Sequence, residues 1–249
     1  MCITLGDLSF DALAAGPEGG ESVLLLHGWP EFADCWRLIM QALAGAGYRA
    51  VAVDQRGYSP GARPLDVTDY AMDRLVADAL GFADQFSWRT FHLVAHDWGG
   101  MVAWTLAGAH PDRLRSLSVL ATPHHVALST ESAADEVQYH RLDYIRFFRK
   151  PGGVAEAALL ADGAARLRAA YGGNIPPAPV DANVERPSPA WRPDRYIELV
   201  SRRRRRSGHA GGPHHDADPL YLGRSRCRAG RVPRGAPQTM SMRPIASVF

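Results

Sequence analysis

An aspartate between two apolar segments is the residue of this chain best placed for covalent chemistry. Residues 91–104 read FHLVAHDWGGMVAW, so that a strand-like run ends at Asp97 and two glycines precede a helix-like run. A sharp turn between strand and helix lifts the side chain at its apex above the sheet, and small neighbours let the two elements approach closely. A carboxylate held there can attack carbon and form an ester. Alternatively, Asp97 serves only as the N-cap of the following helix.

A second segment supplies hydrogen-bond donors for such chemistry. The residues LLLHGWPEF place Trp29 and Pro30 in a loop directly after another apolar run. We expect the backbone N–H groups of Trp29 and of Trp98, the residue after Asp97, to form a two-donor oxyanion hole. His27 precedes a turn without an acid nearby in the sequence, and we expect it to be structural. The Trp29–Pro30 bond is a candidate for a cis peptide.

Both segments belong to a regular alternation of short apolar runs and amphipathic stretches. Strands are predicted over residues 8–16, 22–28, 48–54, 90–96 and 114–123, and helices over residues 32–47, 69–86 and 98–111. Short buried strands that alternate with helices predict an α/β fold with a doubly wound, mostly parallel sheet.

The pattern changes after Pro123. Two helix-like segments, 133–150 and 153–171, follow without buried strands, and from residue 172 the helical signal fades into proline, arginine and glycine. The predicted organisation is therefore a core over residues 1–123, a helical cap inserted above the sheet over residues 124–186, and a tail of different character over residues 187–249.

Composition separates that tail from the rest. The chain has 249 residues, of which 46% are hydrophobic and 22% charged, enough to bury one large core. The tail holds thirteen arginines, no lysine and four acids, a net charge of +9, while the whole chain is only +2. Such a break is typical of an appended tail or of parts of different origin. Three widely spaced cysteines form no disulfide or zinc pattern, and no signal peptide opens the chain, so we expect a cytoplasmic protein.

The motifs resemble the aspartate-nucleophile branch of the α/β-hydrolase family, and within it the epoxide hydrolases. The resemblance rests on HGWPEF, DQRGYSPGARP, VAHDWGGMVAW and DYIRFFRKPGGVAEAAL, which span most of residues 20–186. Haloalkane dehalogenases share the Asp-Trp pair and are the main alternative. The resemblance implies an α/β-hydrolase fold, a small hydrophobic epoxide or haloalkane as substrate, and no cofactor or metal. It leaves the oligomeric state open.

The resemblance also implies a mechanism. Asp97 attacks an epoxide carbon to give an alkyl-enzyme ester, in a site lined by Pro30 and by cap residues that hold the departing oxygen. A histidine oriented by an acid then activates the water that cleaves the ester. The family's first cap tyrosine aligns with Phe147, which cannot donate a hydrogen bond. Tyr144, one helical turn earlier, is the expected substitute, unless both side chains simply pack the cap.

Neither the acid-bearing strand nor the catalytic histidine of that family is found after Arg186. One constant shift of the codon frame lets residues 197–203 encode Leu-Asn-Trp-Tyr-Arg-Ala, the family's second cap-tyrosine motif. The same shift over residues 213–230 permits the family's acid-bearing strand. We therefore expect a frameshift near residue 187, in the gene or in its reading, with a disordered or misfolded tail, missing C-terminal strands and no turnover by the chain as written.

Two features of the tail point instead to binding. Five arginines at 202–206 can contact phosphates, which would make the chain a basic-tailed nucleic-acid-binding relic, but no interleaved aromatic residues accompany them. Residues 208–218, GHAGGPHHDAD, hold metal-ligand types, but adjacent histidines do not easily face one ion. No run approaches the roughly 18 apolar residues of a membrane span. We expect no nucleic acid, metal or membrane as partner.

Overall fold

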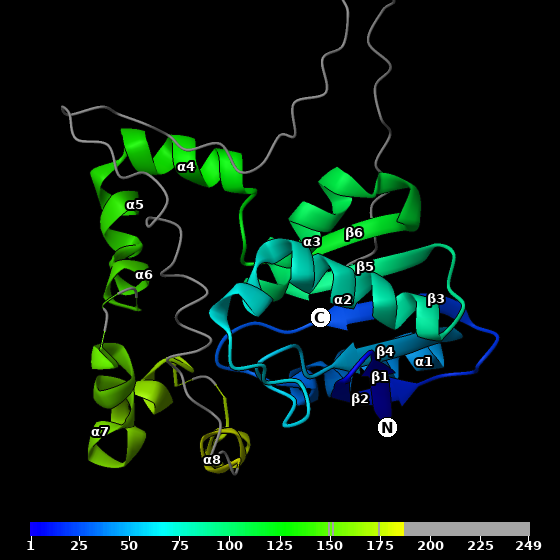
Figure 1. Ribbon diagram of the computed structural model, residues 1–249, viewed down its shortest axis with the longest axis horizontal. Coiled ribbons are helices and arrows are strands. Elements are labelled where there is room, and N and C mark those ends of the chain that lie inside the picture. Colours follow the sequence, from blue (N-terminus) through cyan, green and yellow to red (C-terminus); the bar gives the residue numbers. More distant parts are fainter. Residues whose placement is uncertain (149, 151, 174, 187–249) are drawn as a thin grey trace, which may run out of the picture. The chain divides into compact units, whose positions relative to one another are not determined.

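The computed structural model describes residues 1–148, 150, 152–173 and 175–186 (Figure 1). Strands of these residues form one sheet in the spatial order β1-β2-β4-β3-β5-β6. Strands β4, β3, β5 and β6 are parallel, whereas β1 and β2 form an antiparallel hairpin that pairs with β4. The mostly parallel sheet is confirmed, although β1 was not predicted. The strands are β1 (Cys2–Leu5), β2 (Leu8–Ala15), β3 (Glu21–Leu26), β4 (Tyr48–Val53), β5 (Phe91–His96) and β6 (Leu114–Leu120).

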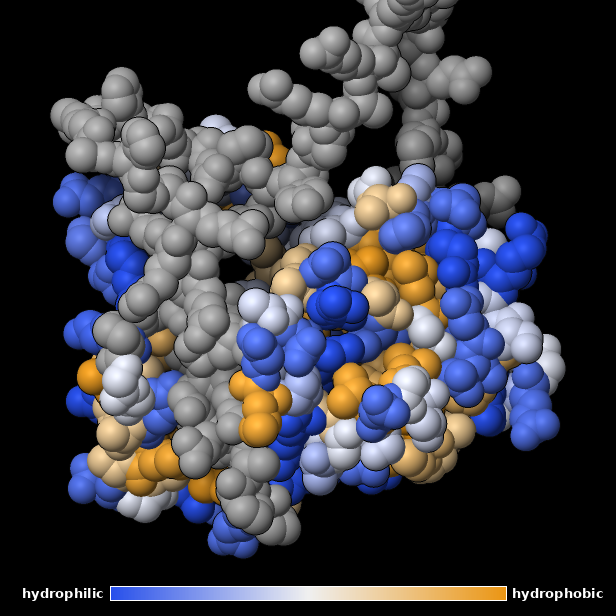
Figure 2. Space-filling view, in the orientation of Figure 1, coloured by the Kyte–Doolittle hydropathy of each residue, from blue (hydrophilic) through white to orange (hydrophobic). Residues whose placement is uncertain are grey.

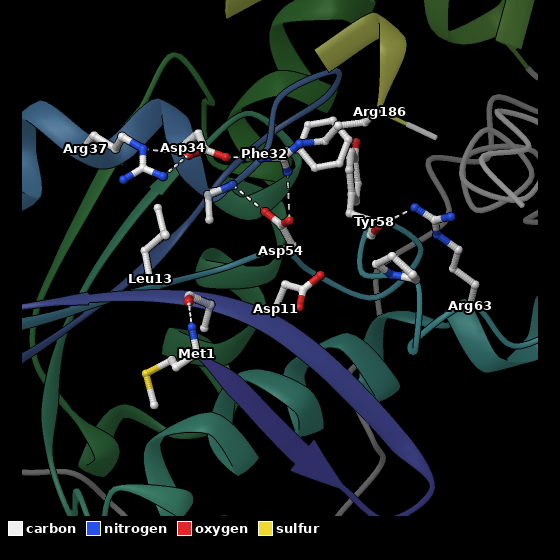
Figure 3. A pocket seen from close by; sticks show the side chains of 13 residues that line it. Met1, Asp11, Leu13, Phe32, Asp34, Arg37, Asp54, Tyr58, Arg63 and Arg186 are labelled. Carbon is white, nitrogen blue, oxygen red and sulfur yellow. Dashed lines mark hydrogen bonds and ion pairs between the residues drawn. The ribbon is translucent and has the colours of Figure 1, made fainter. Parts of the chain in front are cut away.

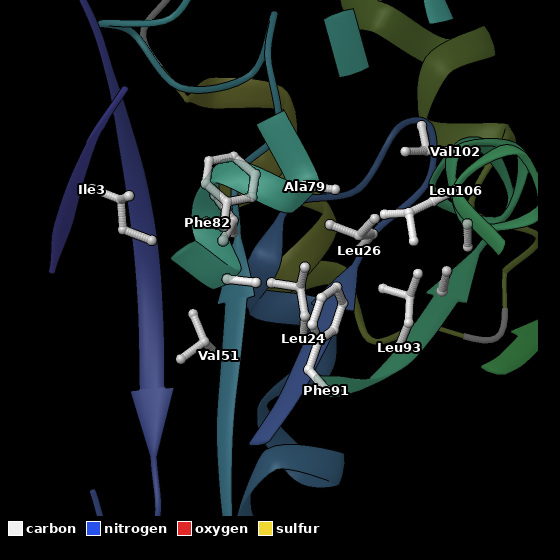
Figure 4. Close-up of a cluster of buried hydrophobic side chains, with 14 of the residues drawn as sticks. Ile3, Leu24, Leu26, Val51, Ala79, Phe82, Phe91, Leu93, Val102 and Leu106 are labelled. Carbon is white, nitrogen blue, oxygen red and sulfur yellow. The ribbon is translucent and has the colours of Figure 1, made fainter. Parts of the chain in front are cut away.

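Helices cover both faces of this sheet, as the doubly wound prediction requires. Alternate residues of a strand face opposite sides. Leu25 of β3 therefore packs with Trp36 and Met40 at one face, while its neighbour Leu24 packs in the cluster with Phe82 at the other (Figure 4). The core helices are η1 (Ala33–Trp36), α1 (Arg37–Gly45), η2 (Val67–Tyr70), α2 (Met72–Gln85), α3 (Trp98–Ala109) and η3 (Pro111–Arg113).

The cap is helical, but its helices are shorter than the sequence indicated. The stretch 133–150, predicted as one helical segment, is divided, because the Asp135 side chain accepts hydrogen bonds from the first turn of a new helix, α5. A helix also spans Pro177–Glu185, where we had expected the helical signal to fade. Proline at the first helical position is compatible with a helix start. The cap helices are α4 (His125–Ala134), α5 (Glu136–Arg141), α6 (Asp143–Phe148), α7 (Val154–Ala169, kinked at 161–164) and α8 (Pro177–Glu185).

The described surface mixes polar and apolar residues. Figure 2 shows hydrophilic and hydrophobic side chains intermingled over the face in view. None of the helices that the structure describes has the length and apolar character needed to span a bilayer.

Candidate active site

Asp97 lies at the apex of a strained turn between β5 and α3. Its φ of +50° and ψ of −116° are unusual for a residue with a side chain and store conformational strain. The turn is fixed from below, because the Asp97 carbonyl accepts hydrogen bonds from Thr122 Oγ1 at 3.0 Å and from the Met101 N–H at 3.1 Å. The Asp97 carboxylate makes no capping hydrogen bond to α3. The alternative in which this side chain serves as the helix cap is therefore wrong.

Two glycines allow the close approach that this turn needs. A Cβ added at Gly28 would lie 2.3 Å from Asp97 Cβ, and one added at Gly99 would lie 2.4 Å from the Leu26 carbonyl oxygen. Both separations are far below van der Waals contact. Any larger residue at either position would push the loop after β3 away from the turn after β5.

The loop after β3 reaches the carboxylate. The Trp29 N–H donates to Asp97 Oδ1 at 2.9 Å, and the Trp29–Pro30 bond is cis. Trp98 is the first residue of α3, where a backbone N–H points out of the helix end rather than into the helical ladder. The structure thus brings Trp29 and Asp97 together, with Trp98 next in sequence to the carboxylate.

His27 supports that loop from inside the core. It is fully buried, its Nε2 accepts a hydrogen bond from the Gln55 N–H at 3.2 Å, and its Nδ1 lies 3.0 Å from the Gly28 carbonyl oxygen. Burial lowers the pKa of His27 and so favours the neutral ring. A neutral ring that accepts at Nε2 carries its proton on Nδ1, which donates to Gly28. The expected structural role of His27 is confirmed.

A pair that we did not predict, His96 with Glu31, lies next to Asp97. His96 Nδ1 lies 3.4 Å from Glu31 Oε2. The hydrogen bond with Glu31 raises the pKa of His96, and the charge of Asp97 raises it further, while the same bond lowers the pKa of Glu31. The sequence signal was available, since Glu31 closes HGWPE and His96 immediately precedes Asp97.

The cap brings aromatic side chains to the same loop. Tyr144 is 47% exposed, and its ring meets Phe148 edge to face at 5.7 Å. Burial, and the negative charge of Asp97, raise the pKa of Tyr144. Phe148, which the sequence reasoning missed, is buried and packs against Trp29 with ring centroids 4.9 Å apart. Phe147 instead packs against the cap cluster around Phe148.

Pro30, the other predicted substrate contact, is tied to the cap through its carbonyl. The Tyr171 hydroxyl donates to the Pro30 oxygen at 2.7 Å. The indole N–H of Trp29 is buried and has no hydrogen-bond partner within the described residues. The loop therefore contacts the cap through the Trp29 ring and the Pro30 carbonyl.

The DQRGYS segment, residues 54–59, makes a structural contact with the core helix α2. Arg56 forms a buried, bidentate ion pair with Asp78 of α2, with both N···O distances at 2.7 Å. A cavity of about 390 Å³ opens beside Asp54 and Tyr58 (Figure 3). Neither Asp97 nor Tyr144 lines this cavity.

Several predicted features fall outside the described residues. The second cap-tyrosine motif, the acid-bearing strand, the arginine run and the segment 208–218 all lie beyond residue 186. Within the described ranges, no group of three or more His, Cys, Asp and Glu side chains is arranged to hold a metal ion.

Comparison with known proteins identifies the family of this chain. The model of the alpha/beta hydrolase fold family matches residues 21–195. The chain belongs to the α/β-hydrolase family. This α/β hydrolase is 34% identical over 191 residues to the AB hydrolase superfamily protein YfhM of Bacillus subtilis, covering 76% of this chain and 66% of that protein. It is 37% identical over 189 residues to Epoxide hydrolase A of Mycobacterium tuberculosis, covering 75% of this chain and 58% of that protein.

A solved structure shares the fold. The epoxide hydrolase of Bacillus megaterium, crystallised with an inhibitor, aligns with a TM-score of 0.70 and 24% identity over 81% of this chain and 75% of that one. The alignments with the two sequence relatives extend over 66% or less of those proteins, so the activity of a whole relative does not pass directly to this α/β hydrolase.

Proposed function

We propose that this α/β hydrolase is epoxide hydrolase-like and that Asp97 opens a small hydrophobic epoxide through a covalent ester. The observation that carries the proposal is the strained apex, where the carboxylate leaves α3 uncapped and instead accepts the Trp29 N–H at 2.9 Å. Strain maintained at a turn is typical of a functional position. A relative named Epoxide hydrolase A, 37% identical over 189 residues, supports the substrate class.

The proposed first step is alkylation of the carboxylate. The Asp97 oxygen that is not held by Trp29 attacks an epoxide carbon, and the ring C–O bond to that carbon breaks. The released oxygen takes a proton and becomes the hydroxyl group of a hydroxyalkyl ester. Tyr144 is the proposed proton donor, because it carries a phenol one helical turn before Phe147 and lies near enough to Asp97 for the charge of that carboxylate to act on it. Pro30 and Phe147 would contribute apolar surface to the substrate site.

The proposed second step is ester hydrolysis. Water attacks the ester carbonyl, and the N–H groups of Trp29 and Trp98 stabilise the oxyanion. This step needs a histidine that activates water and an acid that orients it. The frameshift hypothesis places the acid-bearing strand in codons now read out of frame as residues 213–230, and neither the acid nor the histidine is found after Arg186 in the chain as written. We propose that the chain as written stops at the ester, in a cytoplasmic protein that needs no cofactor.

Incubation with styrene oxide, followed by intact-mass and peptide mass spectrometry, tests the proposal. We expect an adduct of one substrate per chain, on Asp97, and no release of diol. An adduct on another residue, or none, would overturn the assignment of Asp97. Steady production of diol would overturn the proposed block after the first step.

One observation favours a second candidate, a haloalkane dehalogenase-like activity. Phe147 aligns with a cap tyrosine of the epoxide hydrolases that this chain resembles, and phenylalanine cannot donate a proton. A departing halide needs no proton, so the loss of that donor would not hinder dehalogenation. A primary bromoalkane offered under the same conditions separates the two candidates. Bromide release with an Asp97 adduct that forms faster than the epoxide adduct would favour the dehalogenase-like function, and the reverse order would favour epoxide opening.

A further inference from the structure

The loop that carries the Trp29 N–H is held from two sides. This loop, residues 28–34, is contacted on the core side by His96 and Asp54: Glu31 pairs with His96, and the Ala33 N–H donates to Asp54 Oδ1 at 2.6 Å. The cap contacts it through Phe148, Tyr171 and Arg186, which come from the end of α6, the turn after α7 and the end of α8. The loop 28–34 is therefore held in contact with both the core and the cap.

The Tyr171 contact is short and well enclosed. Tyr171 is 8% exposed, and its hydroxyl donates to the Pro30 oxygen at 2.7 Å, one residue beyond Trp29. The Asn183 side chain of α8 hydrogen-bonds the same phenol. Burial raises the pKa of Tyr171 to about 12, although the bond with Asn183 opposes the rise. The phenol therefore remains a donor across the neutral and mildly alkaline range.

The Arg186 contact fixes the other end of the loop. Its guanidinium pairs with Asp34 and, at 3.0 Å, with Asp54 Oδ2, and it stacks over the Phe32 ring at 4.2 Å from the centroid (Figure 3). Asp54 Oδ1 accepts the Ala33 N–H of the loop, and Arg186 pairs with the other oxygen of the same carboxylate. Arg186 therefore holds in place a side chain that itself binds the loop. Charged hydrogen bonds of this kind are stronger than neutral ones.

We propose that Tyr171 and Arg186 are positioning residues, which hold the loop 28–34 from the cap so that the Trp29 N–H reaches the carboxylate of Asp97. The proposal rests on the proposed function of Asp97. Tyr171 acts through Pro30, and Arg186 acts through Asp34 and Asp54. Because a displacement of about 1 Å at a reacting group can cost on the order of 100-fold in rate, and two core contacts remain, we expect about a 10-fold loss for each single substitution.

The test compares full-length variants in single-turnover ester formation with styrene oxide. Tyr171→Phe removes one hydroxyl, and Tyr139→Phe, at a 47% exposed tyrosine of α5, is the matched control. Arg186→Gln removes the charge, and Arg186→Lys restores charge without the planar fork. We expect the maximal rate of adduct formation to fall about 10-fold in Tyr171→Phe and in Arg186→Gln, partly recover in Arg186→Lys and stay unchanged in Tyr139→Phe, with the half-saturating concentration unaffected.

Hydrogen–deuterium exchange supplies a readout that is independent of chemistry. Exchange in the peptide that contains Trp29 is expected to accelerate in Tyr171→Phe and Arg186→Gln while α2 and α3 stay protected. A merely structural role would instead loosen the cap and core together or change neither. A parent that forms no adduct contradicts the proposed function. Variants with unchanged exchange at Trp29, or with unchanged rates beside a reactive parent, contradict the positioning role.

Discussion

The backbone N–H of Trp29 lies 2.9 Å from Asp97 Oδ1, although 68 residues separate the two in sequence. They meet because β3 and β5 are parallel neighbours, so the loops at their carboxyl ends open at the same edge of the sheet. The contact engages one oxygen of the carboxylate, and the proposed function assigns the attack to the other. Fold topology thus turns two distant motifs into one site.

Replacing Asp97 by asparagine is expected to abolish ester formation and leave the fold intact. Asparagine tolerates positive φ better than most residues and keeps an oxygen that can accept the Trp29 N–H, but it is not a carboxylate nucleophile. Mass spectrometry after exposure to styrene oxide checks the adduct, and circular dichroism checks the fold. A folded Asp97→Asn variant that still gains one substrate equivalent would show that another residue reacts.

Gly99→Ala is expected to destabilise the protein, whereas Gly108→Ala on the same helix is not. A Cβ at Gly99 would meet the Leu26 carbonyl at 2.4 Å, so backbone must move at a cost of about 1–3 kcal/mol. A Cβ at Gly108 meets nothing within 4 Å, and alanine there should add up to about 1 kcal/mol of helix stability. Urea unfolding of the two variants measures the difference, and equal stabilities would refute the close approach of α3 to β3.

The Glu31–His96 pair is expected to stabilise the fold most between about pH 4.5 and pH 6.5. The folded-state pKa of His96 is raised above its ordinary 6.5, so its contribution is complete below pH 6.5 and is lost as pH rises through the folded value. The pKa of Glu31 is lowered from 4.5, so its contribution is present above pH 4.5 and is lost as pH falls through the folded value. For this half-buried pair we expect about 1 kcal/mol.

Denaturant unfolding across that pH range, with Glu31→Gln beside the parent, measures the contribution. The histidine NMR titration should show the pKa of His96 falling toward its ordinary value in the variant. Glu136→Gln is the matched control, because Glu136 is a highly exposed partner of His140 at 3.8 Å. If both variants change stability equally at every pH, the pair near Asp97 has no special contribution.

Tyr144 and Phe147 give opposite predictions for proton donation. Tyr144→Phe removes the proposed donor, and ester formation from an epoxide should slow by about 100-fold, the lower range for general acid catalysis. Phe147→Tyr adds a hydroxyl at the position of the cap tyrosine in the epoxide hydrolases that this chain resembles. This substitution should accelerate ester formation from an epoxide. Single-turnover rates with styrene oxide check both changes. A bromoalkane is the internal control, since its rate should respond to neither substitution.

The sequence predicted most of the core because its signals are local. The apolar run 22–28 and the glycine-rich turn after Asp97 each determine an element from neighbouring residues, and β3, β5 and α3 follow. The contact of Tyr171 with Pro30 could not be predicted in this way. Tyr171 and Pro30 are 141 residues apart, and nothing in either segment indicates the other. Helix α8 was missed because the three prolines at 176, 177 and 179 read as a breaker, whereas they lie at the N-cap and in the first turn, where proline is tolerated.

Shifting the codon frame by one base near residue 187 is expected to restore turnover. The shifted frame permits the second cap-tyrosine motif and the acid-bearing strand of the family that this chain resembles, and the family match of the present chain ends at residue 195. That frame supplies the acid, and turnover further requires that the uninterrupted gene supplies the histidine; the two together would hydrolyse the Asp97 ester, so diol should accumulate over many turnovers. Sequencing the gene, expressing the shifted reading frame and measuring diol against time check the prediction. An uninterrupted gene that encodes residues 187–249 as written, with steady diol from the present chain, would refute the frameshift.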